Sequence, residues 1–168
     1  MIKIIPLALL ILSIFSHSLY SHNNDSENSE KQISRVLNLF HKAASDGDAK
    51  NYFSLFSHNA IFIGTDPDET WTLKEFKAFA EPYFKQGIGW TYIPRNRHIY
   101  FSKSTQTAWF DEVLDNEKYG ETRGTGVLIK TAKGWKIAQY HLTLPIPNAI
   151  TTEVVKLIKT NQTKSNER

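Results

Sequence analysis

The chain has 168 residues, no cysteine, and a formal net charge of +3 from 20 basic and 17 acidic side chains. Without cysteine, disulfides, zinc–thiolate sites and cysteine nucleophiles are excluded. Charges of both signs are interspersed, so the composition argues against a nucleic-acid-binding protein. The length suits one domain with a single hydrophobic core.

The first residues have the layout of a secretory signal peptide. Met1 and Lys3 precede an apolar run over residues 4–15, and small and polar residues follow it. The run is too short for a transmembrane helix. We therefore expect residues 1–21 to be a signal peptide, the mature chain to be secreted or periplasmic, and any membrane contact to be made through this segment alone. An uncleaved membrane anchor is the alternative.

A polar segment and a long amphipathic helix are predicted next. Residues 22–28 are expected to form a disordered linker. Ser29 and Gln32 form a capping box, which predicts that a helix begins there. One face of this helix is apolar, with Ile33, Val36, Leu37, Phe40, Ala43 and Ala44 at helical spacing.

Two further helices flank a short strand. Asp48 is a candidate cap for a short second helix. An apolar strand over residues 60–63 follows, and then a turn-rich loop. Thr72 and Glu75 form a second capping box, which predicts the start of a third helix. Pro82 should kink or shorten that helix.

Four long strands are predicted in the second half of the chain, over residues 90–102, 105–114, 119–131 and 135–144. Short polar turns separate them, so we expect an antiparallel meander. A last helix over residues 150–159 and a polar tail follow. Because helices must bury their apolar stripes against one face of a sheet, this order of elements predicts an α+β domain with a strongly curved sheet.

Several motifs resemble those of one known family. They are the loop Phe62-Ile63-Gly64-Thr65-Asp66-Pro67, the side chain of Trp71, the segment Arg123-Gly124-Thr125-Gly126, and the ending Gly134-Trp135-Lys136-Ile137 with His141 and Pro145. With the order of elements, they resemble the SnoaL-like branch of the nuclear transport factor 2-like (NTF2-like) superfamily. The resemblance covers residues 29–148 and leaves residues 149–168 as a C-terminal helix and tail.

The resemblance implies a cone-shaped barrel, in which a curved mixed or antiparallel sheet wraps around three N-terminal helices. It also implies a pocket between sheet and helices, and commonly a homodimer. Members of the superfamily include polyketide cyclases, ketosteroid isomerases, dehydratases, kinase association modules and proteins that only bind. Fold therefore carries over better than function, and no catalytic residue of the family can be matched to a position in this chain.

Strand register groups five side chains on one face of the sheet. If three-residue hairpin loops join the last three strands, Thr125 lies opposite His141, Asp111 lies opposite Arg123, and Trp109 lies opposite Thr125. A one-residue slip in the first of these hairpins is the alternative, and it would put Glu112 opposite Arg123 and Phe110 in place of Trp109. The same face is apolar further along. We therefore predict that this row lies at the mouth of a small-molecule pocket.

Three of these residues have chemistry suited to catalysis. His141 titrates near neutrality and could transfer a proton. Asp111 could orient His141 or act as a base, and Arg123 could hold a carboxylate or stabilise an enolate-like anion. Each also has a structural interpretation, with His141 as a hydrogen-bonded pocket or core histidine and Asp111–Arg123 as a cross-strand ion pair.

The other candidates are ligand-binding residues. Trp109 and Trp71 could stack on a flat ligand, and Thr125 lies in the same row as Trp109. Asp66 follows a strand and could bring a carboxylate to the pocket mouth, although an aspartate beside a proline is also a common turn former. Scattered histidines and the lack of a glycine-rich phosphate loop give no reason to expect a metal or a cofactor.

The opposite sheet face is predicted to be the outer one and to form a homodimer interface. Its apolar residues are Ala108, Phe110, Leu114, Leu128, Ala138, Tyr140 and Leu142. Three hypotheses remain open: an exported domain that binds a small organic molecule, a cofactor-free acid–base enzyme of isomerase, cyclase or dehydratase type, and a dimeric protein-association module.

Overall fold

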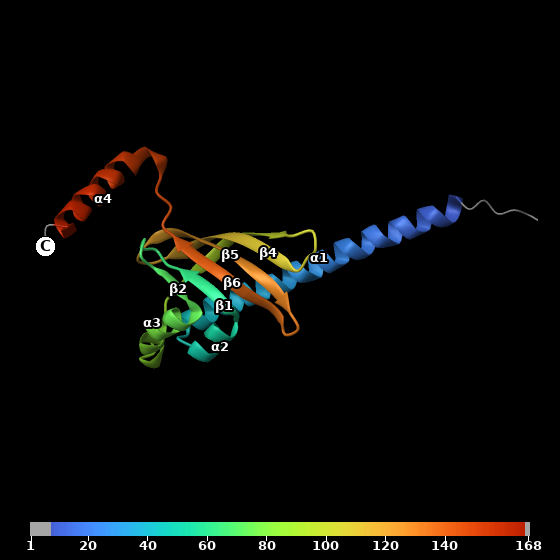
Figure 1. The fold of residues 1–168 in the computed structure, drawn as a ribbon, viewed down its shortest axis with the longest axis horizontal. Coiled ribbons are helices and arrows are strands. Elements are labelled where there is room, and N and C mark those ends of the chain that lie inside the picture. The colour runs from blue at the N-terminus through green and yellow to red at the C-terminus, as the bar shows by residue number, and fades with distance from the viewer. Residues whose placement is uncertain (1–7, 167–168) are drawn as a thin grey trace, which may run out of the picture.

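The computed structural model describes the backbone of residues 8–166 and the side chains of residues 27–162. Its elements are, in order, α1 (Ala8–Ser45), α2 (Ala49–Ser54), β1 (Phe56–Ile63), β2 (Thr70–Thr72), α3 (Leu73–Lys85), β3 (Ile93–Phe101), β4 (Thr107–Asn116), β5 (Gly120–Thr131), β6 (Gly134–Thr143), the 3₁₀ turn η1 (Asn148–Ile150) and α4 (Thr151–Asn166), shown in Figure 1.

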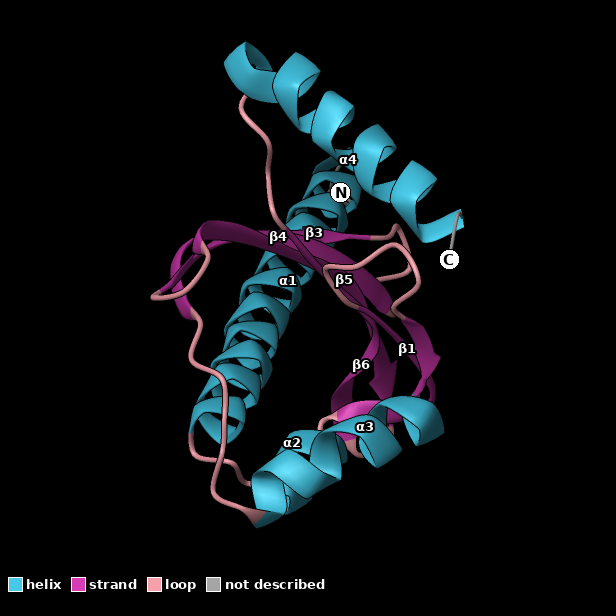
Figure 2. Cartoon of the chain, turned by 90° about the vertical axis from the view of Figure 1, so that its left-hand side faces the viewer, coloured by secondary structure: helices cyan, strands magenta, loops and turns pink. Residues whose placement is uncertain are grey.

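The six strands form one curved, open sheet in the order β2-β1-β6-β5-β4-β3. The strands from β3 to β6 make the predicted antiparallel meander, and β1 pairs with β6 in parallel. The predicted α+β class and mixed sheet are confirmed. Helices α2 and α3 lie on one side of the sheet, and α4 lies on the opposite side (Figures 1 and 2).

Helix α1 begins much earlier than the sequence predicted. It starts at Ala8, so the expected linker over residues 22–28 is helical, and Ser29 is buried within the helix and does not cap it. The reason is that no glycine or proline interrupts residues 8–45, and Glu27 and Lys31 form an i,i+4 ion pair of 2.5 Å. Among the described residues, no helix is long and apolar enough to cross a membrane.

The predicted caps of α2 and α3 are confirmed. The Asp48 side chain accepts a hydrogen bond from the Asn51 backbone N–H at the start of α2. Thr72 and Glu75 form the complete capping box of α3. Pro82 does not end α3, which continues to Lys85. These caps fix the two short helices that cover the end of the sheet.

The core lies between the helices and one sheet face, which we call the inner face. On β4, β5 and β6 its buried side chains include Ala108, Phe110, Glu112, Leu114, Thr122, Leu128, Trp135, Ile137, Tyr140 and Leu142. Phe40 of α1 packs on Tyr140 with ring centroids 4.6 Å apart, and Phe76 of α3 stacks on Phe62 of β1 at 3.8 Å. Most of the residues that we assigned to the outer face therefore form the inner face, and that prediction is wrong.

A β-bulge explains the error. Val127 pairs with Gln139, but Leu128 pairs with Ile137, so Ala138 is an extra residue in β6. Because of this extra residue, Trp135 and Ile137 share the inner face with Tyr140 and Leu142. Strict alternation instead placed Trp135 and Ile137 on the face of His141, and that apolar pair made the wrong face look like the core side.

Candidate functional site

The five side chains of the predicted row do share a face, but it is the outer face, which points away from α1, α2 and α3. Thr125 pairs with His141 as predicted. Asp111 was expected opposite Arg123, but it pairs with Thr125, two residues further along β5, because the pairing of β4 with β5 begins at Asn116 and Gly120. Arg123 consequently lies opposite Val113 and not opposite Asp111.

The outer row is partly open to solvent, with Trp109 and Arg123 exposed and Asp111, Thr125 and His141 half-buried. Trp109 is 46% exposed and stacks on Tyr100 with ring centroids 6.1 Å apart. Asp111 lies 3.1 Å from His98 Nδ1 and accepts a hydrogen bond of 3.3 Å from the Tyr100 hydroxyl. The prediction that this row lines the pocket is wrong. The bulge in β6 puts Trp135 and Ile137 on the face opposite to His141, and that opposite face is the one that meets the helices.

The two predicted loop residues have different outcomes. Trp71 lines a cavity on the inner face. Asp66 is exposed, and its carboxylate accepts a hydrogen bond from the Asp68 backbone N–H. Asp66 thus acts as a turn former, while its neighbours Thr65 and Glu69 reach the cavity.

A cavity of about 110 Å³ lies between the sheet and α3. Its lining is mainly aromatic: Phe62, Trp71, Phe76, Phe79, Trp90 and Tyr92, together with Gly64, Thr65, Glu69 and Leu142. Towards solvent, Thr65, Phe79, Trp90 and Tyr92 also line an open groove of about 900 Å³. The cavity therefore has an aromatic wall and a wide entrance.

A smaller chamber of about 20 Å³ lies deeper, between the sheet and α1. It shares Phe62, Trp90, Tyr92 and Leu142 with the larger cavity. Besides Tyr92, its lining residues with a polar group include His41, Tyr52 and Tyr140. Groove, cavity and chamber thus neighbour one another, since Trp90 and Tyr92 line all three.

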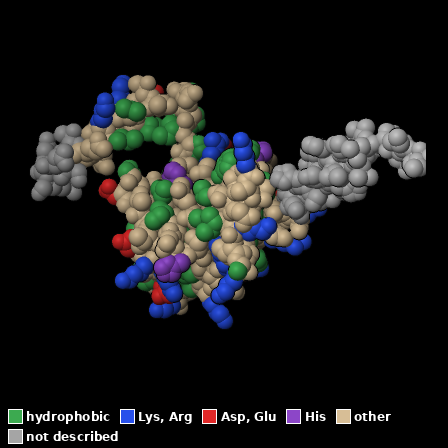
Figure 3. Space-filling view, turned by 45° about the vertical axis from the view of Figure 1, so that its right-hand side comes forward, with side chains coloured by type: hydrophobic (Ala, Val, Ile, Leu, Met, Phe, Trp, Pro, Cys, Tyr) green, Lys and Arg blue, Asp and Glu red, His purple; other side chains and the backbone are tan. Residues whose placement is uncertain are grey.

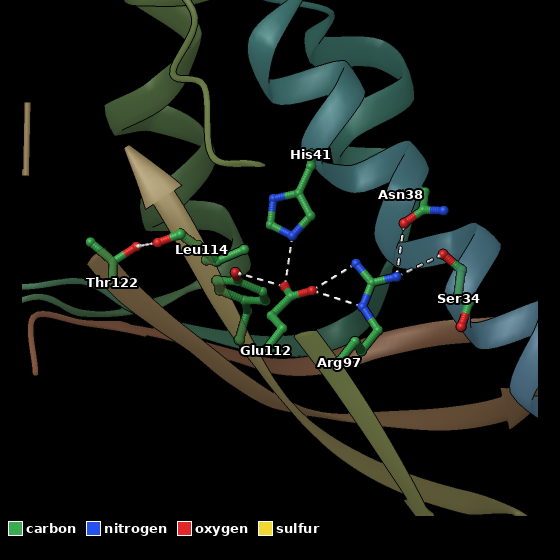
Figure 4. A network of polar contacts seen from close by, with 8 residues as sticks. Ser34, Asn38, His41, Arg97, Glu112, Leu114 and Thr122 are labelled. Carbon is green, nitrogen blue, oxygen red and sulfur yellow. Dashed lines mark hydrogen bonds and ion pairs between the residues drawn. The ribbon is translucent and has the colours of Figure 1, made fainter. Parts of the chain in front are cut away.

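Behind the chamber lies a buried ionic network (Figure 4). His41 Nε2 is 2.6 Å from Glu112 Oε1, and the Tyr140 hydroxyl donates to the same oxygen at 3.2 Å. Arg97 places Nε 2.8 Å and Nη2 2.6 Å from Glu112 Oε2. The Glu112 side chain is 0% exposed. A carboxylate so buried and so fully bonded is held in one position.

Helix α1 holds the Arg97 end of this network in place. Arg97 Nη1 donates to the Asn38 side-chain oxygen at 2.8 Å and to the Ser34 backbone carbonyl at 3.2 Å. The guanidinium therefore ties β3 to α1 on one side and holds Glu112 of β4 on the other. His41 comes from the next turn of the same helix, so sheet and helix are locked together at the chamber.

The network sets two protonation states. Burial raises the pKa of Glu112, but the hydrogen bond to His41, the charge of His41 and the Arg97 guanidinium together lower it below its usual value. Burial, and then the Glu112 charge, raise the pKa of Tyr140 well above its usual value. At neutral pH, Glu112 is therefore an anion and Tyr140 a neutral donor.

A glycine gives the network its room. A Cβ built on Gly124 would overlap the Tyr140 hydroxyl and come within 3.1 Å of Glu112 Cγ. We expected the glycines of the Arg123–Gly126 segment to bend the strand. At Gly124 the structural need is instead a close approach of side chains from β4 and β6.

Sequence reasoning missed His41, Arg97, Glu112 and Tyr140 as site residues. Two signals were available. His41 follows Leu37 by four residues, so it falls on the apolar stripe of the first helix. Glu112 lies between Phe110 and Leu114 at a spacing of two, so it shares their buried face.

The fold is shared with solved NTF2-like proteins. An NTF2-like protein of unknown function from Pseudomonas putida aligns with a TM-score of 0.61 and 11% identity, over 73% of this chain and 90% of that one. A Streptomyces avermitilis protein named for a dehydratase aligns at 0.59 and 14%, over 72% and 99%. An Exiguobacterium sibiricum protein named for a calmodulin-dependent kinase association domain aligns at 0.56 and 18%, over 71% and 95%.

The sequence itself gives the family. Residues 33–147 match the SnoaL-like domain, and the chain belongs to that family. The resemblance inferred from the motifs is thereby confirmed. No curated protein sequence matches the chain.

Proposed function

We propose that the protein binds a small, flat, uncharged organic molecule in the aromatic cavity. The observation that carries this proposal is the set of three neighbouring hollows, from the open groove to the chamber at His41, that are all lined by Trp90 and Tyr92. A concave, mainly aromatic lining with few polar groups is typical of small-molecule sites.

The volumes limit the ligand's size. The cavity of about 110 Å³ is smaller than the roughly 300–1,000 Å³ of drug-sized sites. A ligand of one or two rings therefore fits, with any larger part lying in the groove of about 900 Å³.

The inner chamber selects an oxygen atom. The Tyr52 hydroxyl is fully buried there and, within the described part of the chain, has no partner of good hydrogen-bonding geometry. Burial raises the pKa of Tyr52 well above its usual value, offset in part by the Trp90 side chain. A space of about 20 Å³ holds one water or one ligand oxygen. We therefore expect a hydroxyl or carbonyl group to enter beside Tyr52 and His41.

The charges disfavour an anionic ligand. Arg97 is already paired with Glu112, so no free cation faces the chamber within the described residues. The nearby Glu112 carboxylate would repel a second carboxylate. This replaces the expectation, based on Arg123, of a carboxylate-bearing ligand.

Binding of phenol and 2-naphthol tests the proposal, with benzoate as the anionic comparison. Trp90→Leu should weaken binding at least about tenfold, because it removes an aromatic side chain that lines the groove, the cavity and the chamber. Trp109→Leu is the matched control on the outer face and should change little. Isothermal titration measures both. Equal losses in the two variants, or tighter binding of benzoate than of phenol, would contradict the proposed site.

A second candidate function is acid–base catalysis by His41. Its Nε2 faces the Glu112 carboxylate, and among the described residues no hydrogen-bond partner lies on Nδ1. A carboxylate that orients a histidine in this way is a common arrangement for a general base. The fold relative named for a dehydratase is compatible with proton transfer. Here His41 takes the role that we had assigned to His141, and Glu112 takes that of Asp111.

Paired histidine variants test this second function. In a screen of small hydroxy-ketones for elimination of water, any turnover should be lost in His41→Asn and kept in His141→Asn. Turnover lost equally in both variants would contradict a role for His41 as the base.

We also propose a homodimer through the outer face, with different residues from those first expected. Its apolar side chains are Ile61, Ile63, Tyr100, Trp109, Val113, Val127 and Ile129. The exposed Trp109 and Tyr100 support the proposal, since large exposed apolar patches mark interaction sites. The mass measured by light scattering after gel filtration tests it, and a monomer at all concentrations would contradict it.

Export through the signal segment is a separate proposal. It rests on the sequence of residues 1–21, of which residues 1–7 lie outside the described residues. N-terminal sequencing of the mature protein, isolated from its natural source, tests this proposal. A first residue near position 22 is expected, and an intact Met1 would contradict cleavage.

A further inference from the structure

Helix α4 has an apolar face that no other part of the described chain covers. Ile150 at the end of η1 and Val154, Leu157 and Ile158 of α4 recur at the spacing of one helix face and form what we call the α4 stripe. Leu157 is 70% exposed and Ile158 is 48% exposed. Among the described elements, α4 packs substantially only against the preceding turn η1. A helix of this kind needs a partner to bury its stripe.

The stripe lies on the same side of the molecule as the outer face of the sheet. Figure 2 places α4 on the side of the sheet opposite α2 and α3. In Figure 3 the apolar side chains of α4 line the side that faces the body, with open space between them. The 16 residues of α4 span roughly 24 Å, which covers about five strands at roughly 4.8 Å each. Helix and sheet therefore match in size and in chemistry.

We propose that α4 packs across the outer face of a second copy of this chain, and that the two copies exchange their helices reciprocally. This rests on the homodimer proposed above and names the element that holds it together. Each stripe side chain buries roughly 100 Å², and the sheet beneath buries a similar area. One α4 helix thus buries roughly 800 Å² of total surface, and two exchanged α4 helices bury roughly 1,600 Å², which is the size of a standard stable interface.

The linker makes exchange a better solution than closure on the same chain. Leu144 to Pro147 could reach roughly 14 Å, which is enough to fold α4 back over a sheet about 10 Å away. In the single chain helix α4 nevertheless stands apart from the sheet (Figure 1), and Pro145 and Pro147 stiffen the connection.

A membrane surface is a poorer partner for this helix. Interfacial helices combine a strongly basic face with bulky anchors such as Trp and Phe. Helix α4 contains no aromatic residue, and Glu153 offsets part of its lysine charge. Its aliphatic stripe suits a protein surface that offers Val127, Ile129 and Trp109.

Disulfide trapping in the full chain tests the proposal directly, because the chain has no cysteine of its own. Ile158→Cys and Val127→Cys are combined in one chain and oxidised. We expect a covalent dimer on a non-reducing gel. A cross-linked monomer would show closure on the same chain and overturn the proposal, as would an absence of any cross-link in a chain that gel filtration shows to be dimeric.

Point variants separate this proposal from the dimer itself. Leu157→Glu should raise the dimer dissociation constant at least about tenfold, because a carboxylate replaces a buried apolar anchor. Thr152→Glu, on the opposite side of α4, should raise it less than about threefold. A dimer unaffected by Leu157→Glu would overturn the role of α4 and leave the dimer standing, whereas a monomeric wild-type chain would overturn both. Binding to vesicles of phosphatidylcholine and phosphatidylglycerol that is lost in Leu157→Glu, without any dimer, would assign α4 to membranes and overturn the exchange.

Discussion

Glu112→Gln is the most informative single change at the buried network. The carboxylate accepts hydrogen bonds from His41, Arg97 and Tyr140. Glutamine keeps the shape but loses the charge, and its amide NH₂ must face a group that is itself a donor. The Arg97 guanidinium, whose side chain is only 12% exposed, is left as an unpaired buried charge.

The size of the effect follows from that unpaired charge. Breaking a buried ion pair by removing one partner costs about 3–5 kcal/mol. Domains are stable by only about 5–15 kcal/mol, and each kcal/mol moves the melting temperature by about 2–4 °C for a chain of this length. We therefore expect Glu112→Gln to fold but to melt roughly 6–20 °C below the wild type at pH 7.

The neighbouring Asp111 provides a matched control. Asp111→Asn makes the same chemical change one residue away, on the outer face, where the Asp111 carboxylate contacts His98 and the Tyr100 hydroxyl. Exposed pairs contribute about 0–1 kcal/mol. Urea denaturation followed by circular dichroism measures both variants. If Glu112→Gln loses no more stability than Asp111→Asn, the network is not the ionic core that its geometry indicates.

Two other changes examine the same network. Because the pKa of Glu112 is lowered in the folded state, the ionised carboxylate contributes its full stabilisation above the ordinary glutamate pKa of 4.5, and this contribution is lost as the pH falls through the folded-state pKa. The difference in unfolding free energy between the wild type and Glu112→Gln should therefore become smaller in acid titrations. A difference that stays constant down to pH 3 would contradict this. Gly124→Ala should cost about 1–3 kcal/mol by overpacking against the Tyr140 hydroxyl. Tyr140→Phe should relieve much of that cost in a double-mutant cycle, and strictly additive effects would show that the clash lies elsewhere.

The sequence predicted the fold well because local signals agree with the tertiary structure. The caps at Asp48 and Thr72 and the four strands of the meander depend on nearest neighbours along the chain. Such features are decided within a few residues, so one sequence is enough to find them. The pair Thr125–His141 was predicted for the wrong reason: Thr131 pairs with Gly134 and not with Trp135, and the extra residue Ala138 offsets that one-residue error.

The prediction of the site failed because of a β-bulge, which no local sequence pattern reveals. The extra residue Ala138 changes the phase of β6, so the apolar residues before and after it face the same side. A strict alternation through Trp135 and Ile137 therefore assigned the helices to the wrong face, and with them the pocket. The buried polar pair did leave a local signal that we missed, because Glu112 interrupts an apolar strand face and His41 an apolar helix stripe.

The buried charges themselves argue that this face of the sheet is a site and more than a core. Replacing a buried ion network by apolar residues of similar size is often neutral or stabilising, so stability alone does not require one. The triple variant His41→Leu, Arg97→Met, Glu112→Leu separates the two roles, because it removes every charge together and leaves none unpaired. We expect it to fold about as stably as the wild type and to bind phenol at least about tenfold more weakly, since the chamber loses the group that orients a ligand oxygen. If the triple variant keeps both its stability and its affinity for phenol, the network serves neither folding nor binding, and the polar end of the proposed pocket is wrong.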